Sequence, residues 1–313
     1  MKDKSAINLR KSRERGSIEH QSKISDNDGD IINLASKDVV TIPPSKSIKE
    51  TAETMGEYNF RRLPVTDPGS GKILGIVTVM DILDFLGGGQ KFKIIQNKYQ
   101  DNFLAAINEP VREIMTKDVI CISNKDSISK ALDIMLNNEV GAIPILDGDE
   151  KIVGIVTERD FSLSLGGVLT EELAEDVMTK NVITTTPGTP IESASKIMVR
   201  NRLRRIPIVG EDIEIATTSN DKLLGVVTAS DIIKFFNDKE LFEKMTSNTA
   251  SDVLDKKISE IMATSLINVD PLTRLGDICQ IFKDKDIAGV HVVKNDELLG
   301  IITEKDILKA INN

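Results

Sequence analysis

The heptapeptide Gly-Ile-Val-Thr-Val-Met-Asp at residues 75–81 decides the fold, because close copies of it return three times. The copies are Gly-Ile-Val-Thr-Glu-Arg-Asp at 154–160, Gly-Val-Val-Thr-Ala-Ser-Asp at 225–231 and Gly-Ile-Ile-Thr-Glu-Lys-Asp at 300–306. Their threonines are separated by 79, 71 and 75 residues. Self-similarity at a nearly fixed period is the sequence signature of a repeat architecture. The chain is therefore predicted to consist of four copies of one structural unit.

Two further anchors precede each heptapeptide and are separated from each other by a constant 29 residues. The nearer anchor is an apolar stretch around Pro64, Pro144, Pro207 and His291. A methionine lies 29 residues before each of the last three, at Met115, Met178 and Met262, and Ala35 takes the same place before Pro64. Two anchors that keep a 29-residue spacing in four stretches support the repeat and predict where each copy begins.

Each repeat is predicted to run strand, helix, strand, strand, helix, which makes a mixed α/β (α+β) fold. In the second repeat, residues 119–122 form a β-branched run, and 128–136 carry apolar residues at helical spacing. Residues 142–146 and 152–157 are predicted strands, and Asp-Gly-Asp at 147–149 is a hairpin signal between them. The last helix begins at Thr-x-x-Asp. One such unit buries little apolar surface alone, so the four are expected to pair face to face into two modules.

Two helix starts carry the pattern of a capping box, in which a hydroxyl and a carboxylate bond reciprocally to backbone N–H groups. The first pattern joins Ser47 to Glu50, and the second joins Thr189 to Glu192 with Pro190 at the first helical position. Helices are therefore predicted to begin just after Ser47 and Thr189.

The remaining segments are predicted as a tail and joints. Residues 1–30 are polar and charged, and we expect them to be disordered, with a docking arm as the alternative. The glycines at 87–89 follow a helix and lack the Lys-Ser/Thr ending of a phosphate loop, so they are interpreted as a helix C-cap and hinge. Residues 91–109 are predicted to form a helical connector, and 211–222 to lengthen the third hairpin.

Composition excludes several classes of function. The 313 residues contain 40 Lys plus Arg against 49 Asp plus Glu, a net charge of −9, which disfavours nucleic-acid binding. The two cysteines and two histidines have no zinc-site spacing and leave little room for His-dependent catalysis. The chain has neither an apolar run long enough for a membrane span nor a signal-peptide pattern at its beginning, and we expect a cytoplasmic location.

The Thr-x-x-Asp motif has a structural and a functional interpretation. Thr as N-cap and Asp at the third helical position would satisfy backbone N–H groups that a helix start leaves unpaired. A carboxylate at the mouth of a cleft could also accept both hydroxyls of a ribose, while helix N-terminal amides beside it meet a phosphate. The two roles are compatible, because capping needs only one carboxylate oxygen.

Paired arginines distinguish the odd repeats from the even ones. Arg61-Arg62 and Arg204-Arg205 precede the proline anchor of the first and third repeats, where the second and fourth have Gly and Ala. Arginine pairs suit bidentate recognition of phosphate, and the alternative is a surface charge cluster paired with nearby acids.

At these residues the chain resembles cystathionine β-synthase (CBS) domains, which pair into Bateman modules. The resemblance covers residues 31–313 and is strongest to archaeal four-CBS proteins akin to the γ subunit of AMP-activated protein kinase. It implies a disc of two modules with adenine-nucleotide sites in clefts between paired repeats. The boundaries that follow are a tail at 1–30, repeats at 31–90, 110–168, 169–238 and 258–313, and connectors at 91–109 and 239–257.

The resemblance also implies which residues form the four sites. In each site the Asp would hold the ribose, and the partner repeat would enclose the adenine. A residue of the helix that begins at the motif, or the Arg before the proline anchor, would meet the phosphates. The expected sets are Asp81, Thr78, Arg61 and Arg62 with Thr116, Cys121 and Val140; Asp160, Thr157 and Arg159 with Ser36, Thr41 and Phe60; Asp231, Thr228, Ser230, Arg204 and Arg205 with Asn268 and Ile287; and Asp306, Thr303 and Lys305 with Thr179, Thr184 and Leu203.

The expected function is a non-catalytic regulator that binds AMP, ADP or ATP and controls an unidentified partner protein, as a monomeric disc or a homodimer. Alternatives are a sensor of S-adenosylmethionine or methylthioadenosine, which share adenosine but lack phosphate, and an interaction scaffold. Ala263 in place of Thr and His291 in place of Pro depart from the family pattern, so individual sites could be empty. No phosphate loop, dinucleotide fingerprint or catalytic constellation supports an enzyme.

Overall fold

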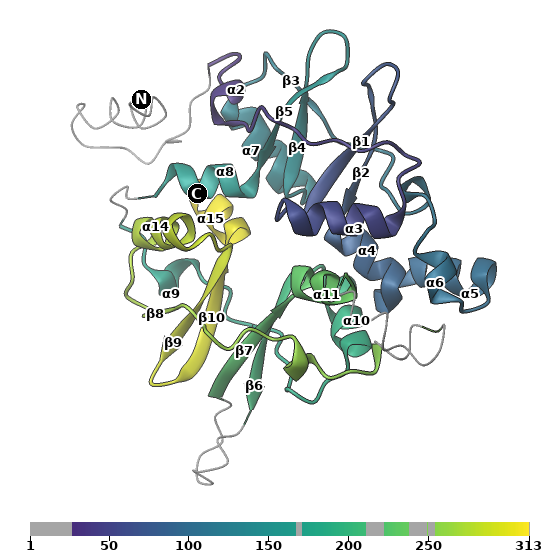
Figure 1. Cartoon of the computed structure of the whole chain (residues 1–313). Helices are drawn as coiled ribbons and strands as arrows, with labels where there is room; N and C mark the ends of the chain where they lie inside the picture. The colour runs from purple at the N-terminus through teal and green to yellow at the C-terminus, as the bar shows by residue number, and fades with distance from the viewer. Residues whose placement is uncertain (1–26, 167–170, 211–221, 238–248, 250–253, 313) are drawn as a thin grey trace. The chain divides into compact units, whose positions relative to one another are not determined.

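The computed structural model describes residues 27–166, 171–210, 222–237, 249 and 254–312 (Figure 1). Most of the predicted polar tail, the insertion in the third hairpin and most of the 239–257 connector lie outside the described residues.

Every repeat contains an antiparallel hairpin followed by a helix that starts at Thr-x-x-Asp. The hairpins are β1 (Arg62–Thr66) with β2 (Ile73–Thr78), β4 (Ala142–Leu146) with β5 (Ile152–Thr157), β6 (Arg205–Gly210) with β7 (Lys222–Thr228), and β9 (Gly289–Lys294) with β10 (Glu297–Thr303). The helices that follow are α4 (Val79–Leu83), α8 (Glu158–Ser164), α11 (Ala229–Phe236) and α15 (Glu304–Asn312). Each hairpin shifts register just before the motif glycine, a β-bulge that recurs in all four repeats.

The first half of each repeat is a helix preceded by a short parallel pairing. The helices are α3 (Ile48–Glu57), α7 (Ile128–Asn138), α10 (Ile191–Asn201) and α14 (Leu275–Lys285). In the even repeats β3 (Ile122–Ser123) and β8 (Asn268–Val269) pair in parallel with β4 and β9. In the odd repeats the pairing is a single bridge, Ile42 with Val65 and Thr185 with Ile208. The predicted order of elements, and with it the α/β fold class, is confirmed.

The two predicted capping boxes have different outcomes. Ser47 accepts from the backbone N–H of Glu50, and the Glu50 carboxylate accepts from Ser47, as predicted. The box at Thr189 is wrong, because α10 begins after Pro190 without a side-chain cap. The first N–H group of α10, that of Ile191, donates instead to the carbonyl of Lys256 at 2.8 Å, and the Thr189 hydroxyl bonds to that of Thr185. A tertiary backbone contact has replaced the local cap.

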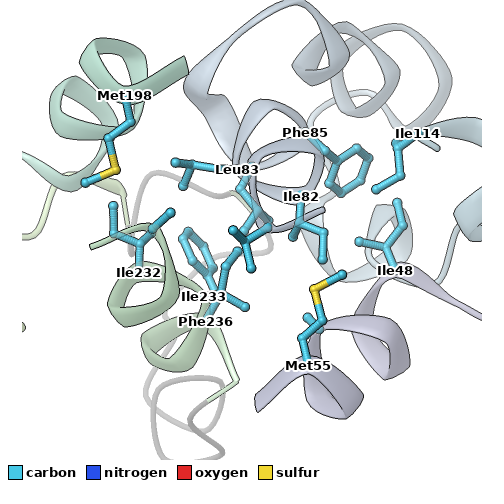
Figure 2. Close-up of a cluster of buried hydrophobic side chains, with 14 of the residues drawn as sticks. Ile48, Met55, Ile82, Leu83, Phe85, Ile114, Met198, Ile232, Ile233 and Phe236 are labelled. Carbon is cyan, nitrogen blue, oxygen red and sulfur yellow. The ribbon is translucent and has the colours of Figure 1, made fainter. Parts of the chain in front are cut away.

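Contacts divide the chain into two compact units that cut across the repeats. The odd unit comprises residues 40–119 and 183–266, and the even unit comprises the described residues up to 39 with 120–182 and 267–313. In the odd unit, helices of the first and third repeats share one core, where Leu83 and Phe85 lie in the same cluster as Met198, Ile232 and Phe236 (Figure 2). In the even unit, α8 and α15 of the second and fourth repeats pack together. Each unit therefore joins the helical layers of two alternate repeats.

The start of each repeat crosses onto the hairpin of its neighbour. Thr116, which opens the second repeat, pairs with Ile76 of the first, and Ser36 of the first pairs with Ile155 of the second. The third and fourth repeats exchange segments in the same way through Thr179 with Ile301 and Ala263 with Val226. This reciprocal exchange pairs repeat one with two and repeat three with four, which confirms the predicted pairing.

The crossing segment explains the glycine of the repeated heptapeptide. A Cβ atom on Gly75 would lie 2.6 Å from the Sδ atom of Met115 and 2.9 Å from the carbonyl oxygen of Thr116. Cβ atoms on Gly225 and Gly300 would meet the equivalent segments at 2.9 and 2.6 Å. In these three repeats glycine is required because the neighbouring repeat lies directly against its Cα, whereas a Cβ on Gly154 would meet Ala35 and Ser36 only at 3.4 Å.

The glycine run at 87–89 ends the helix after α4, as predicted for a C-cap. The chain forms the π-helix η2 (Asp84–Gly88), where Gly87 has φ 128°, and then the 3₁₀ turn η3 (Gln90–Phe92). A Cβ on Gly88 would lie 2.6 Å from Val199 of α10, so glycine also permits the close packing of the first and third repeats.

The connector that follows is helical and is held by a buried acid. It contains α5 (Lys93–Tyr99) and α6 (Phe103–Ala106). Both Lys98 and Tyr99 donate to the carboxylate of Glu109, which is 2% exposed. Burial tends to raise the pKa of Glu109, but the bonds from Lys98 and Tyr99 lower it overall. The remaining short elements are α2 (Ile31–Leu34), η4 (Val111–Glu113), α9 (Ala174–Val177) and η5 (Ile258–Glu260).

Candidate functional site

All four motif aspartates cap their own helices through one carboxylate oxygen. Oδ2 of Asp81 accepts from the backbone N–H of Thr78 at 2.8 Å and from its hydroxyl at 2.7 Å. Asp231 makes the same two bonds to Thr228, at 2.8 and 2.7 Å. The pairs Thr157 with Asp160 and Thr303 with Asp306 repeat this geometry. Capping therefore fixes each carboxylate at a helix start and uses a single oxygen, as the sequence predicted.

The second oxygen, Oδ1, has a different environment in each repeat. Oδ1 of Asp306 accepts from the hydroxyl of Thr179 at 2.9 Å, which brings together two residues predicted for one site. Oδ1 of Asp81 accepts from Lys91 at 2.5 Å. Within the described residues, no hydrogen bond reaches Oδ1 of Asp160 or Asp231. Opposite Asp231 the crossing segment carries Ala263, which has no hydroxyl to offer.

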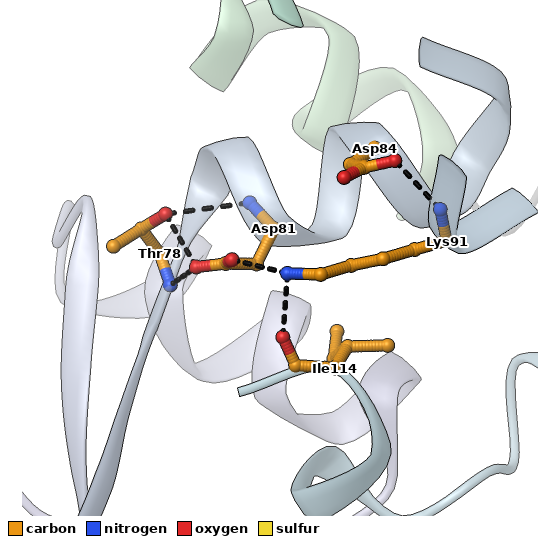
Figure 3. A network of polar contacts seen from close by, with 5 residues as sticks. All are labelled: Thr78, Asp81, Asp84, Lys91 and Ile114. Carbon is orange, nitrogen blue, oxygen red and sulfur yellow. Dashed lines mark hydrogen bonds and ion pairs between the residues drawn. The ribbon is translucent and has the colours of Figure 1, made fainter. Parts of the chain in front are cut away.

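Lys91 is a partner of Asp81 that the motif analysis missed. Its ammonium bridges Asp81 and the carbonyl oxygen of Ile114, which lies 2.7 Å away (Figure 3). Ile114 immediately precedes the segment that crosses onto the first hairpin. Lys91 follows the glycine run and belongs to no repeated position, so the comparison of repeats gave no signal for it.

Asp160 has the least favourable environment for a charged carboxylate. Burial raises the pKa of Asp160, and the nearby Glu304 carboxylate raises it further, while the bonds from Thr157 and the charge of Arg159 oppose the shift. The protonated form of Asp160 is therefore favoured to a higher pH than in an ordinary aspartate.

The first arginine of each pair lies beside a motif helix. The carbonyl oxygen of Arg61 accepts from the N–H of Val79, the first residue of α4, at 2.9 Å. The carbonyl oxygen of Arg204 accepts from Ala229, the first residue of α11, at the same distance. Both arginines, with Arg62 and Arg205, are half-buried. The backbone therefore holds each pair next to the helix start that carries Asp81 or Asp231.

The cations of the even repeats are engaged by acids. Arg159 contacts Asp286 at 2.5 Å and Glu304 at 3.3 Å, and Lys305 contacts Glu139 at 3.2 Å. Sequence reasoning missed all three acids, because each belongs to the partner repeat within the even unit and none occupies an invariant position of the shared motif. The place of Arg159 and Lys305 in their predicted sites stays a prediction, and any phosphate bound there would compete with these ion pairs.

The residues predicted to enclose the adenine are divided between the units. Thr41, Phe60, Thr116, Thr184 and Leu203 lie in the odd unit, and Ser36, Cys121, Val140, Thr179, Asn268 and Ile287 lie in the even unit. Each predicted set draws on both units, and its assembly into one cleft stays a prediction.

Local contacts within a unit are defined for several of these residues. Phe60 is 38% exposed and stacks on Tyr58, with 5.5 Å between ring centroids. The hydroxyl of Thr41 is bonded to that of Thr66, and Thr116 and Ser36 lie exposed on the crossing segments.

Cys121 is half-buried beside an open hollow of the second repeat of about 270 Å³. Burial raises the pKa of its thiol. The thiol is therefore kept neutral and behaves as an apolar wall residue.

Neither a metal-ligand cluster nor a membrane-length apolar helix is present among the residues that the structure describes. Those residues contain no group of three or more His, Cys, Asp or Glu side chains that could hold a metal ion. No helix among them has the length and apolar character that a membrane span requires.

The fold and the repeated Thr-x-x-Asp helix starts define a tandem CBS-domain protein. The chain belongs to the CBS domain family, whose model matches residues 29–88, 111–166, 174–238 and 258–313. It is 38% identical over 275 residues to the uncharacterised protein MJ1225 of Methanocaldococcus jannaschii, covering 87% of this chain and 95% of that one. The crystal structure of MJ1225, described as a proposed archaeal homologue of γ-AMPK, matches with a TM-score of 0.81 over 90% of this chain and 99% of the other.

Two more distant archaeal proteins share the full-length arrangement. An uncharacterised 33.4 kDa protein of Thermofilum pendens is 24% identical over 273 residues, with 87% of this chain and 88% of that protein covered. The structure of an uncharacterised conserved protein from Pyrococcus horikoshii has a TM-score of 0.57 at 20% identity over 90% of this chain and 99% of that one, which shows the common fold.

Proposed function

We propose that this protein is a non-catalytic regulator that binds adenine nucleotides, AMP, ADP or ATP, and transmits their occupancy to a partner protein. The observation that carries the proposal is the hydrogen bonding of the Asp231 carboxylate. Thr228 holds one oxygen of its carboxylate, and no described residue bonds to the other. A rigid carboxylate with one oxygen open, at the N-terminus of an eight-residue helix, suits a ribose diol beside a phosphate.

The arginine pair supplies the second element of recognition. Arg204 is tied by its backbone to Ala229, the first residue of α11, two residues before Asp231. A guanidinium there would meet the phosphate of a nucleotide whose ribose sits on Asp231. The first repeat has the same arrangement of Arg61, Thr78 and Asp81. Similarity to MJ1225, whose structure is described as a proposed homologue of γ-AMPK, supports a regulatory role.

Calorimetry of Arg204→Ala with AMP and adenosine in parallel tests the proposal. Loss of a charge-assisted contact worth about 1.5–3 kcal/mol should weaken AMP about 10- to 150-fold and leave adenosine nearly unchanged. Arg112→Ala is the matched control, because Arg112 is half-exposed and pairs only with its neighbour Glu113 among the described residues. Equal losses for AMP and adenosine would show that Arg204 is structural, and no binding of any adenosine compound at millimolar concentration would exclude the sensor function.

A second ligand class is favoured at the even aspartates, Asp160 and Asp306. Their neighbouring cations, Arg159 and Lys305, are already paired with acids. A ligand with adenosine but no phosphate, such as S-adenosylmethionine or methylthioadenosine, would leave those pairs intact. Competition of S-adenosylmethionine against AMP in wild type and in Asp231→Asn distinguishes the two classes, since only AMP should depend on Asp231.

A further inference from the structure

The ammonium group of Lys91 forms a partly buried bridge over the start of α4. Its Nζ atom lies 2.5 Å from Oδ1 of Asp81 and 2.7 Å from the carbonyl oxygen of Ile114 (Figure 3). The two charged side chains are 28% and 13% exposed. An ion pair that is shielded from solvent and supported by a second hydrogen bond holds more firmly than an exposed surface pair.

The backbone fixes Lys91 in this position. Its N–H donates to Oδ1 of Asp84 at 2.8 Å, and Asp84 lies one turn after Asp81. The glycine run makes the return of the chain possible: Gly87 has φ 128°, and a Cβ on Gly89 would lie 2.6 Å from Oδ1 of Asp84. The chain therefore doubles back, and Lys91 reaches the carboxylate ten residues before it.

The other three motif aspartates differ from Asp81 at this oxygen. Asp306 accepts there from a neutral hydroxyl, that of Thr179, and Asp160 and Asp231 accept from no described residue. Among the parts of the chain that the structure describes, Lys91 is the one cation within ion-pair distance of a motif aspartate.

We propose that Lys91 is an internal competitor for the ribose at Asp81, so that the first repeat binds nucleotide only when Lys91 is displaced. The proposal rests on the proposed function and assigns an order to its sites. A ribose on Asp81 would be accepted by Oδ1, the oxygen that capping leaves open, and Lys91 already occupies that oxygen. The Asp81 site therefore binds AMP about 10- to 100-fold more weakly than the Asp231 site and fills last as the nucleotide concentration rises.

The test is calorimetric titration of the full chain with AMP. Lys91→Met removes the ammonium and keeps an apolar stem of similar length. We expect this variant to gain a binding event about 10- to 100-fold tighter than the weakest event of the wild type. The gain should vanish when Asp81→Asn is added, and it should not occur with 2′,3′-dideoxy-AMP. Lys93→Met is the matched control, because Lys93 is exposed two residues away.

Each outcome decides for or against the competitor role. An unchanged AMP isotherm in Lys91→Met overturns it, and a weakened isotherm shows that Lys91 contacts the ligand instead. If AMP binds at other sites and Lys91→Met gains no tighter binding event, only the competitor role is rejected. If AMP binds to neither the wild type nor any variant, the nucleotide site itself is rejected. If Lys91→Met does not fold, Lys91→Leu, which also has no side-chain donor for Asp81, is read by the same criteria.

Discussion

Arg159 of the second repeat donates to Asp286 of the fourth, with 2.5 Å between Nη2 and Oδ1. The relationship is reciprocal, because Lys305, at the equivalent position of the fourth repeat, contacts Glu139 of the second at 3.2 Å. Both acids are the left-handed residues that end α7 and α14, at φ 53° and 51°. The even unit therefore has a pair of related ion pairs that tie each motif helix to the other repeat.

Arg159→Ala is expected to destabilise the protein more than Asp286→Ala. Asp286 is largely exposed, so its removal should cost less than about 1 kcal/mol. Arg159 also contacts Glu304, which is 2% exposed, and truncation removes this charged contact from a buried carboxylate, at a cost of about 1–3 kcal/mol. Urea unfolding of the two single variants and the double variant measures the coupling. Equal losses in the two single variants would show that the Glu304 contact contributes nothing.

Gly75→Ala should lower the free energy of unfolding by about 1–3 kcal/mol, because the new methyl group overlaps Met115 and the backbone of Thr116. Gly148→Ala is the control: a Cβ there meets nothing within 4 Å, and stability should hardly change. Thermal or urea unfolding gives the comparison. If Gly75→Ala left the free energy of unfolding unchanged, the crossing segment would have moved aside without cost. Its packing would then not require glycine at position 75.

Asp160 should make stability fall as pH rises. Its pKa is raised in the folded protein, mainly by burial, above the ordinary value of 3.8. Between pH 3.8 and the raised pKa, the folded state binds more protons than the unfolded state. The stability that the protonated Asp160 carboxyl contributes is therefore fully present below pH 3.8 and is lost as the pH rises through the raised pKa. Urea unfolding of wild type and Asp160→Asn across acidic pH should show this loss in wild type only.

Asp126 should make stability fall as the pH falls, which is the opposite direction from Asp160 and gives a comparison for that experiment. Partial burial tends to raise its pKa, but hydrogen bonds from Lys130 and from the N–H of Ser123 lower it overall. Its contribution to stability is present above pH 3.8 and is lost as pH falls through the lowered pKa. If Asp126→Asn and Asp160→Asn change the pH profile in the same direction, the assigned environment of Asp160 is wrong.

Asp231→Asn separates capping from ligand binding. The amide oxygen still accepts from Thr228, so the variant should fold almost normally, whereas Asp231→Ala should lose about 0.5–2 kcal/mol with the cap. The amide NH₂ cannot accept from a ribose hydroxyl, so AMP affinity should fall at least about tenfold in the Asn variant. Calorimetry with AMP and 2′,3′-dideoxy-AMP provides the measurement. Equal weakening of the two ligands would remove the ribose role from Asp231.

The sequence by itself determined the repeat, its order of elements, the pairing of neighbouring repeats and the capping role of Thr-x-x-Asp. These follow from periodicity and from bonds between residues three apart, such as Thr228 and Asp231, which local sequence specifies. Even the glycine of the heptapeptide was visible as an anchor, although its reason, the contact of Gly75 with Met115, lies in the neighbouring repeat.

Tertiary structure alone decided what surrounds the second oxygen of each aspartate. Lys91 reaches Asp81 because the glycine run folds the chain back, and Arg159 meets Glu304 across 145 residues. The cap predicted at Thr189 gave way to the carbonyl of Lys256 for the same reason. Long side chains and N–H groups outside regular structure bond to whichever partner the tertiary structure brings within about 3 Å. No local sequence pattern indicates which partner that is.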